Sequence, residues 1–253
     1  MDELTEGPGS NNRLVIYTAL FGDYDNLVDP PEEYRGCDFV CFTDQRQLKS
    51  KVWEIRIIEH CDLPPNLMNR RYKMLPHLFF SDYTYSLYID SNVGFKVNPI
   101  LKISDLNKNH IMVYEHQFRK SIAEEAKECA RLGYHNLFKF CTQLKRYFIA
   151  GFDVNRSGLY ECNIIYRRHN DIQVESAMED WWREYVNGVK RDQISFPYIL
   201  WKHSLKPRSM GVTNIRNTKT SFELHEGHKK GRSFAQKIIG RMNRILLGLY
   251  ERG

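Results

Sequence analysis

Short apolar runs alternate with stretches of helical periodicity as far as residue 204. Apolar runs of this length predict buried strands, and apolar residues spaced three and four apart predict helices. The predicted strands cover residues 13–22, 37–44, 52–58, 83–90, 110–116 and 159–170. The predicted helices cover residues 64–80, 119–147, 174–186 and 192–204, with Pro76 and Pro197 inside two of them. Strands that alternate with helices predict one α/β domain whose largely parallel sheet is covered on both faces.

The chain divides into three parts by composition. Residues 1–12 are acidic, polar and glycine-bearing, and we expect them to be disordered. Residues 13–228 hold the predicted domain. Residues 229–253 form a tail with seven basic side chains and one acid, Glu251, a balance that equals the net charge of +6 of the whole chain. The rest of the chain is therefore neutral overall, and we expect no nucleic-acid partner.

The tail has the pattern of an amphipathic helix. Its apolar residues form a single stripe at 3.6 residues per turn. The stripe consists of Phe234, Ile238, Ile239, Met242, Ile245, Leu246, Leu249 and Tyr250. Basic residues on the other face are typical of a helix that lies on an anionic membrane surface. Alternatively, the stripe packs on the chain's own core, or on a second copy to make a homodimer.

Several classes of protein are disfavoured by what the sequence lacks. No run of 18 apolar residues predicts a membrane span, and no apolar segment near residue 1 predicts a secretory signal. We therefore expect a cytoplasmic protein, peripheral on the inner face of the cell membrane if the tail binds lipid. The six cysteines form no C-x-x-C pair, which argues for reduced thiols and against a zinc site. Motifs of phosphate loops, dinucleotide-binding loops, serine hydrolases and zinc proteases are missing.

The segment "YSLYIDSNV", residues 85–93, is the first candidate for chemistry. Its apolar run ends in Asp90, Ser91 and Asn92. In open α/β sheets, ligands bind just beyond the carboxyl ends of the strands. An aspartate at this point can hold a hard cation or a sugar hydroxyl. Asp and Asn are also ordinary turn residues, so a plain turn is the alternative.

Two other segments carry residues suited to a nucleotide. In "GDYDN", residues 22–26, Asp23 suits a ribose or base contact and Tyr24 suits base stacking, although a simple turn is the alternative. Arg70, Lys73 and His77 are spaced to share one helix face. Such a row of cations can hold a diphosphate, and it can equally be a solvated basic face.

Two late segments add further candidates. Arg191, Asp192 and Gln193 open a predicted helix, where an acid suits the helix N-terminus and can also serve as a general base. His225, which has acids as neighbours, can complete a metal shell that a strand-end aspartate begins. The alternative for His225 is an ordinary surface histidine.

The order of these segments resembles a glycosyltransferase-like family, once catalogued as a domain of unknown function and linked to plant mucilage-pectin and bacterial surface-glycan synthesis. The matching segments are "YTALFGDYDNL", "CDFVCFTD", "NRRYKMLPHLFF", "YSLYIDSNV", "EHQFRKSIAEEAKEC", "ECNIIYRRHN" and "RDQISFPYILWK", which span residues 15–203. The resemblance implies a GT-A fold, a single Rossmann-like nucleotide-sugar-binding domain with a mixed, mostly parallel sheet.

The activity that the resemblance implies is transfer of a hexosyl or pentosyl residue from a nucleotide-diphosphate-sugar donor. The acceptor would be a glycan or a lipid-linked glycan in surface-polysaccharide synthesis. The alternative is a catalytically silent GT-A-like domain that binds a glycan or a partner protein. Asn92 favours this alternative, because it stands where the D-x-D motif of GT-A enzymes has a second aspartate, and an amide binds a cation more weakly than a carboxylate does.

The resemblance also assigns roles to residues. Asp90 and Asp192 would be catalytic, and Asp90, Asn92 and His225 would hold Mn²⁺ or Mg²⁺ on the donor phosphates. The donor-binding residues would be Thr18, Phe21, Asp23, Tyr24, Asp44, Arg70, Lys73, His77, Ser91 and Asn92. The residues on the acceptor or sugar side would be His116, Arg119, Glu161, Arg168, His169, Arg191 and Gln193.

Overall fold

A seven-stranded sheet with the order β3-β2-β1-β4-β7-β6-β8 forms the centre of the molecule. The computed structural model describes residues 13–22, 25–34, 37–99, 106, 109–213, 221–225 and 233–250. The strands of the sheet are β1 (Leu14–Leu20), β2 (Asp38–Thr43), β3 (Glu54–Ile57), β4 (Tyr85–Ile89), β6 (Ile111–His116), β7 (Tyr160–Arg167) and β8 (Arg208–Thr213). A second small sheet pairs β5 (Val93–Phe95) with β9 (Phe222–Leu224) in antiparallel register.

The direction of β7 decides where the ends of the strands meet. β1 to β4 run parallel to one another, whereas β7 runs antiparallel to both of its neighbours, β4 and β6. β6 is therefore parallel to β4, and β8 is parallel to β6. The carboxyl ends of β1, β4 and β6 lie at one edge of the sheet, and β7 begins at that same edge. The sheet is mixed and mostly parallel, as predicted.

Both faces of the sheet are covered. Successive side chains of a strand point to opposite faces. Val15 and Tyr17 of β1 therefore join the core beneath the helices, whereas Ile16 joins a second core with Phe95 and Phe222 of the small sheet. All seven residues of β1 are buried for this reason, which agrees with its nearly continuous apolar sequence.

The helices are α1 (Pro65–Met74), α3 (Ile122–Leu132), α4 (Leu137–Ile149), α5 (Ile172–Asn187), α6 (Asp192–Lys202) and α7 (Phe234–Tyr250). Two predicted helices are shorter than expected. α1 ends at Met74 and a 3-10 turn follows over Pro76–Leu78, because proline lacks an N–H and disfavours a helical residue before it. The predicted helix 119–147 is two helices, since Gly133 ends α3 with a left-handed φ of 80° and Asn136 caps α4.

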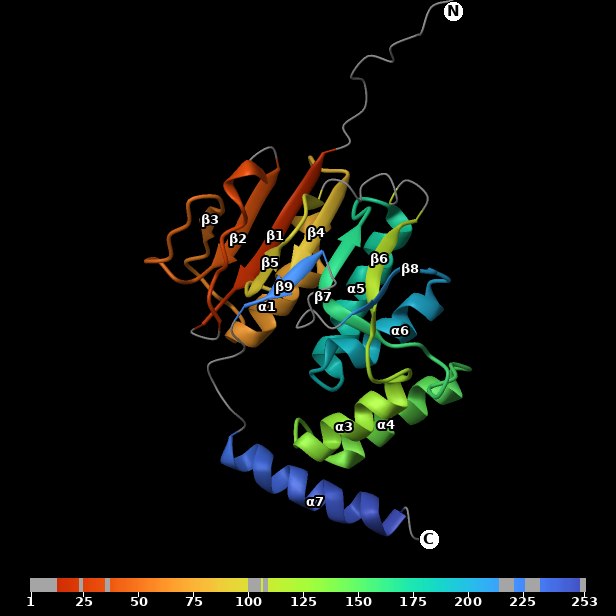
Figure 1. The fold of residues 1–253 in the computed structure, drawn as a ribbon. Helices are drawn as coiled ribbons and strands as arrows, with labels where there is room; N and C mark the ends of the chain where they lie inside the picture. Colours follow the sequence, from red (N-terminus) through yellow and green to blue (C-terminus); the bar gives the residue numbers. More distant parts are fainter. Residues whose placement is uncertain are drawn as a thin grey trace, which may run out of the picture.

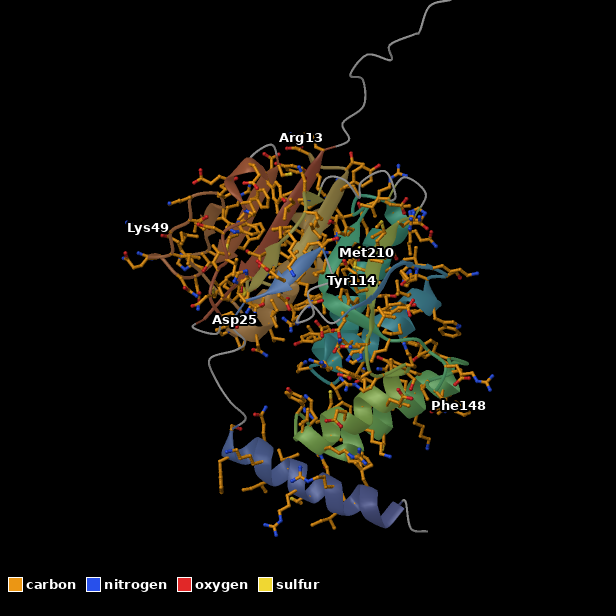
Figure 2. All side chains as sticks on the ribbon, in the orientation of Figure 1. Arg13, Asp25, Lys49, Tyr114, Phe148 and Met210 are labelled. Carbon is orange, nitrogen blue, oxygen red and sulfur yellow. The ribbon has the colours of Figure 1, made fainter. Side chains whose placement is uncertain are left out.

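α7 lies in the predicted tail and confirms the C-terminal helix. It begins with a capping box, in which Gln236 N donates to Ser233 Oγ at 3.2 Å and Ser233 N donates to Gln236 Oε1 at 2.9 Å. Figure 1 shows α7 beneath α3 and α4, at the end of the molecule toward which β1 and β4 run. In Figure 2, Arg13 and Asp25 mark the two opposite ends of β1. The carboxyl edge of the sheet and α7 therefore face the same end.

Two sequence expectations about compartment and boundaries are not decided by the fold. Within the described ranges, no helix combines the length and the apolar character needed to cross a membrane. The predicted disordered segment 1–12 lies outside the described residues, so the domain boundaries stay predictions. All six cysteines are free thiols.

Candidate functional site

Asp90 stands at the carboxyl end of β4 with a fixed backbone and a partly exposed carboxylate. Its backbone N–H donates to Asn163 O of the neighbouring strand at 2.9 Å. The hydroxyl of Tyr88, two residues earlier on the same face, donates to Asp90 Oδ1 at 2.9 Å. The side chain of Asp90 is 33% exposed, whereas Ser91 and Asn92 after it are buried. The strand thus delivers one carboxylate to the edge of the sheet in a fixed position.

Lys73 connects Asp90 to a second carboxylate, Asp192 at the start of α6. Lys73 Nζ donates to Asp192 Oδ2 at 2.6 Å and lies 3.9 Å from Asp90 Oδ1. Arg70 Nε lies 3.3 Å from the same oxygen of Asp192. Burial by itself raises the pKa of Asp192, but Lys73, Arg70 and Arg191 outweigh this and hold the pKa well below its ordinary value. Asp192 is therefore ionised and locked between cations.

The end of α1 is held in place from behind by a buried arginine. Arg167 of β7 is fully buried and donates to Lys73 O at 2.8 Å and to the hydroxyl of Tyr17. The Tyr17 hydroxyl in turn donates to Lys73 O at 3.0 Å. Burial lowers the pKa of Arg167. These bonds fix the backbone from which Lys73 reaches the two carboxylates.

Glu161, at the start of β7, is a third carboxylate at this edge, in a different environment. Gln193 Nε2 donates to Glu161 Oε2 at 2.9 Å, and His116 Nε2 lies 3.6 Å from Glu161 Oε1. Burial raises the pKa of Glu161 to about 7, and Arg191 offsets part of that effect. Burial and the neighbouring Arg119 lower the pKa of His116 to about 4, so this imidazole is neutral at pH 7.

A buried glutamate that the sequence analysis missed orders the arginines beside Glu161. Glu125 of α3 accepts from Arg119 Nε at 2.5 Å and from Arg191 Nε at 2.9 Å. It is 1% exposed. The signal was present in the sequence, because Glu125 occupies the buried stripe of α3 together with Ile122 and Cys129. An acid in an apolar stripe requires a buried partner.

The small sheet brings His225 next to Asn92. His225 N donates to Asn92 O at 2.9 Å. Gly94 leaves room for the imidazole, since a Cβ at that position would lie 2.6 Å from His225 Nε2. A hollow of about 310 Å³ opens beside them, lined by Asn26, Val28, Asn92 and His225. Asn92 and His225 were both predicted metal ligands, and the fold places them side by side.

Among Asp90, Asn92 and His225, Asp90 alone offers a carboxylate to a cation. In the part of the chain that the structure describes, no group of three or more His, Cys, Asp or Glu is arranged to hold a metal ion. Mg²⁺ and similar cations at phosphate sites need only one or two carboxylates, because phosphate and water oxygens complete the shell. Asp90 supplies the single carboxylate of that second situation, and Asn92 and His225 line the hollow described above.

Three predicted site residues lie away from this edge. Arg168 and His169 follow the end of β7, and β7 runs antiparallel, so they lie at the opposite edge of the sheet. His169 Nε2 is hydrogen-bonded to Phe80 O at 2.8 Å, and burial lowers its pKa to about 4. Their prediction came from the family resemblance. His77 lies beyond the end of α1, with Nε2 3.8 Å from Glu179, and does not share the face of Arg70 and Lys73.

The remaining predicted donor residues surround the end of β1. Thr18 and Phe21 are fully buried. The carboxylate of Asp44 accepts from Gly22 N at 3.0 Å and so fixes the turn after β1. Two further residues, Asp23 and Tyr24, lie outside the described residues. Donor binding by this group stays a prediction.

The chain also matches a known protein family. Residues 8–222 match the family described as TOD1/MUCI70, glycosyltransferase-like domain. The matched range contains the whole edge described above except His225, and it stops before α7. A comparison with curated proteins found no match. Because the family covers well over half of the chain, the protein belongs to the TOD1/MUCI70 glycosyltransferase-like domain family.

Proposed function

We propose that the protein is a glycosyltransferase that moves a sugar from a nucleotide-diphosphate sugar to a hydroxyl of a glycan or lipid-linked glycan, in surface-polysaccharide synthesis. The family membership supports the reaction class. The observation that carries the proposal is the pairing of two unlike carboxylates at one edge of the sheet. Asp90 lies beside Lys73, and Glu161 contacts Gln193 and His116 and has a pKa that burial raises to about 7.

The donor diphosphate binds at Asp90. Asp90, Asn92 and His225 are the residues that would hold Mn²⁺ or Mg²⁺ there, and such a cation would neutralise charge on the departing diphosphate. Arg70, whose side chain is 29% exposed, adds positive charge at the same place. Its guanidinium can form paired hydrogen bonds with phosphate oxygens. Lys73 is almost fully buried, and its ammonium group holds the carboxylates of Asp90 and Asp192 in fixed positions.

Glu161 accepts the proton of the acceptor hydroxyl. The hydroxyl oxygen bonds to the anomeric carbon as its proton passes to the carboxylate. The bond from that carbon to the β-phosphate oxygen breaks, and its electron pair leaves on the nucleoside diphosphate. A general base works best when its pKa lies near the operating pH, and the pKa of Glu161 is raised to about 7. Its side chain is 25% exposed, so an acceptor can reach it.

Asp192, the sequence-based candidate for the base, is a positioning residue in this proposal. Its side chain is 6% exposed, and both Lys73 and Arg70 contact the same oxygen. A carboxylate with a pKa far below 7 has little tendency to accept a proton. Its function is to hold the two cations beside the donor phosphates.

The test of donor binding is thermal unfolding of the full chain with a panel of nucleoside diphosphates and nucleotide sugars, with and without Mn²⁺. Ligand at a hundredfold its Kd stabilises by about 2.7 kcal/mol, which raises Tm by about 5–10 °C in a chain of this size. We expect a metal-dependent rise with one base that disappears in Asp90→Ala. Asp82→Ala, which removes an exposed carboxylate before β4, is the matched control and should keep the rise. No rise with any nucleotide contradicts the proposal.

The role of Glu161 has a separate test. Glu161→Gln should keep the nucleotide-induced rise in Tm but lose turnover by about 10²–10⁴-fold, the range for a general base. The wild-type rate should increase with pH through about 7, as Glu161 loses its proton. If Glu161→Gln keeps full turnover, Glu161 is not the general base, and the proposed transferase activity is unaffected by that result. If wild type binds nucleotide but releases no sugar, the silent binding domain that Asn92 favours is correct.

A further inference from the structure

Polar groups of α7 attach it to the rest of the protein. Asn243, in the middle of α7, is 2% exposed. Its Nδ2 donates to Ala130 O and to His135 O, both at 2.8 Å, and its Oδ1 accepts from Leu137 N at 3.0 Å. One amide thus pairs Leu137 N, in the first turn of α4 where helices leave N–H groups unpaired, and His135 O in the preceding loop. Its bond to Ala130 O adds to the one that this carbonyl accepts from Gly133 N.

Two glycines let the backbones of α3 and α7 come into contact beside Asn243. A Cβ at Gly133 would lie 1.9 Å from Gln236 O, and a Cβ at Gly240 would lie 2.8 Å from Arg131 O. Larger residues at these positions would therefore force the helices apart. The close approach and the bonds of Asn243 together fix which side of α7 faces the protein.

The opposite side of α7 is apolar and exposed. At 3.6 residues per turn, Asn243 and Gly240 lie on one side of the helix, and Phe234, Ile238, Met242 and Ile245 lie on the other. The exposed apolar residues are Phe234, Ile238, Met242, Ile245 and Leu246, with exposed fractions between 45% and 78%. A surface helix normally turns its apolar stripe to the core. A row of large exposed apolar side chains marks an interaction surface.

Positive charge borders this apolar face along one side. Lys237, Arg241 and Arg244 are exposed, and residues 233–250 contain no acid. Arg244 also donates to Arg131 O at 2.8 Å, which helps to fix the helix. A second copy of this face would bring like charges together, whereas an anionic surface attracts them. The charge therefore selects a lipid surface over a twin subunit.

The position of α7 in the molecule also suits contact with a lipid surface. α7 lies at the end of the molecule that the carboxyl edge of the sheet faces (Figure 1). The exposed Phe148 of α4 is at this end as well (Figure 2). A helix bound in the plane of a membrane would bring that edge close to the lipid surface. α7 lies outside the residues that match the family.

We propose that α7 is an interfacial membrane helix that places the face of Phe234, Ile238, Met242, Ile245 and Leu246 in an anionic lipid bilayer, with Lys237 and Arg241 at the headgroups. This arrangement, with an apolar face, a basic border and a length below that of a membrane span, is typical of helices that lie in the interface. The proposal does not depend on the enzymatic activity.

The experiment is co-sedimentation of the full chain with vesicles of phosphatidylcholine alone or with phosphatidylglycerol added. Wild type should bind only the anionic vesicles, and salt should weaken the binding. Ile238→Glu with Ile245→Glu should lower the partition coefficient at least about tenfold, since apolar insertion is lost. Lys237→Gln with Arg241→Gln should lower it about fivefold per residue.

Two matched variants control for apolarity and charge elsewhere. Ile172→Glu removes an exposed isoleucine after the end of β7, and Lys49→Gln with Lys51→Gln removes two exposed cations near β3. Both should bind vesicles as wild type does, and circular dichroism should show every variant folded. The proposal is overturned if wild type does not bind anionic vesicles, or if Ile238→Glu with Ile245→Glu binds them equally well. It is also overturned if that double variant instead converts a dimer to a monomer.

Discussion

The buried contact between Lys73 and Asp192 gives the sharpest test of how the site is built. Asp192→Asn keeps the shape of the side chain and an oxygen that can accept from Gln193 N, but it removes the charge. Lys73, 2% exposed, is then left with Asp90 at 3.9 Å as its nearest carboxylate. The variant thus leaves a buried ammonium with one distant partner.

The magnitude follows from this geometry. Removing one member of a buried ion pair costs about 3–5 kcal/mol. Asp90 remains nearby and Arg70 is partly exposed, so we expect a loss near the lower limit, about 3 kcal/mol. At about 2–4 °C per kcal/mol for a chain of this size, Tm should fall by about 6–12 °C. Lys73→Met combined with Asp192→Asn should recover part of the loss, because the buried charge is then gone.

The same carboxylate predicts a dependence of stability on pH. The pKa of Asp192 is depressed in the folded protein, and its ordinary value in an unfolded chain is about 3.9. The stabilisation is therefore fully present above that ordinary value and is lost as pH falls below it, toward the folded pKa. Between pH 7 and pH 3, wild type should lose more stability than Asp192→Asn.

Urea denaturation of both proteins at these two pH values measures the difference directly. Glu59→Gln, which changes an exposed carboxylate in a surface ion pair, is the control and should behave as wild type does. The reasoning is refuted if Asp192→Asn unfolds within about 0.5 kcal/mol of wild type at pH 7, the range of ordinary surface substitutions.

Three other substitutions test the packing around the site and α7. Gly133→Ala should release α7, because its Cβ would clash with Gln236 O; amide hydrogen exchange should then show α7 unprotected, and unchanged protection would contradict the contact. Asn243→Ala should cost about 1–3 kcal/mol, since Leu137 N and His135 O lose their bonds to its amide, whereas Ala130 O keeps its bond from Gly133 N; urea denaturation measures this, and a neutral result would contradict the capping role. Glu125→Gln should cost about 3–5 kcal/mol, because it leaves two arginines without their buried carboxylate; a change in Tm below about 2 °C would argue against it.

Six of the seven strands of the large sheet and the position of Asp90 were predictable because both depend on local sequence; β8 was not predicted. The apolar run of β4 and the polar residues after it mark the end of the strand without any knowledge of its neighbours. The 3-10 turn at Pro76 and the break at Gly133 carried ordinary signals, and their effect on helix length was underestimated. Short strands such as β5 depend on pairing with a distant segment, so the local pattern did not reveal them.

The errors in the site come from long-range geometry. Arg168 and His169 were placed at the site by the family resemblance, but they follow the end of an antiparallel strand and lie at the opposite edge of the sheet. The direction of a strand is set by its connection and not by its own residues. Because β7 runs antiparallel to β4 and β6, Glu161 at its start lies at the carboxyl ends of those strands, where the site is. In α7, periodicity found the apolar stripe, but the side that faces the protein is set by Asn243 and the glycines.

The central claim is that the edge around Asp90 performs sugar transfer from a nucleotide donor. The most direct measurement is release of nucleoside diphosphate from a panel of nucleotide sugars, with Mn²⁺ present, by wild type, Asp90→Ala and the control Asp82→Ala. We predict release from one class of donor by wild type and by the control, and loss of that release in Asp90→Ala. Equal release by Asp90→Ala would contradict the site, and no release from any donor would contradict the enzymatic function itself.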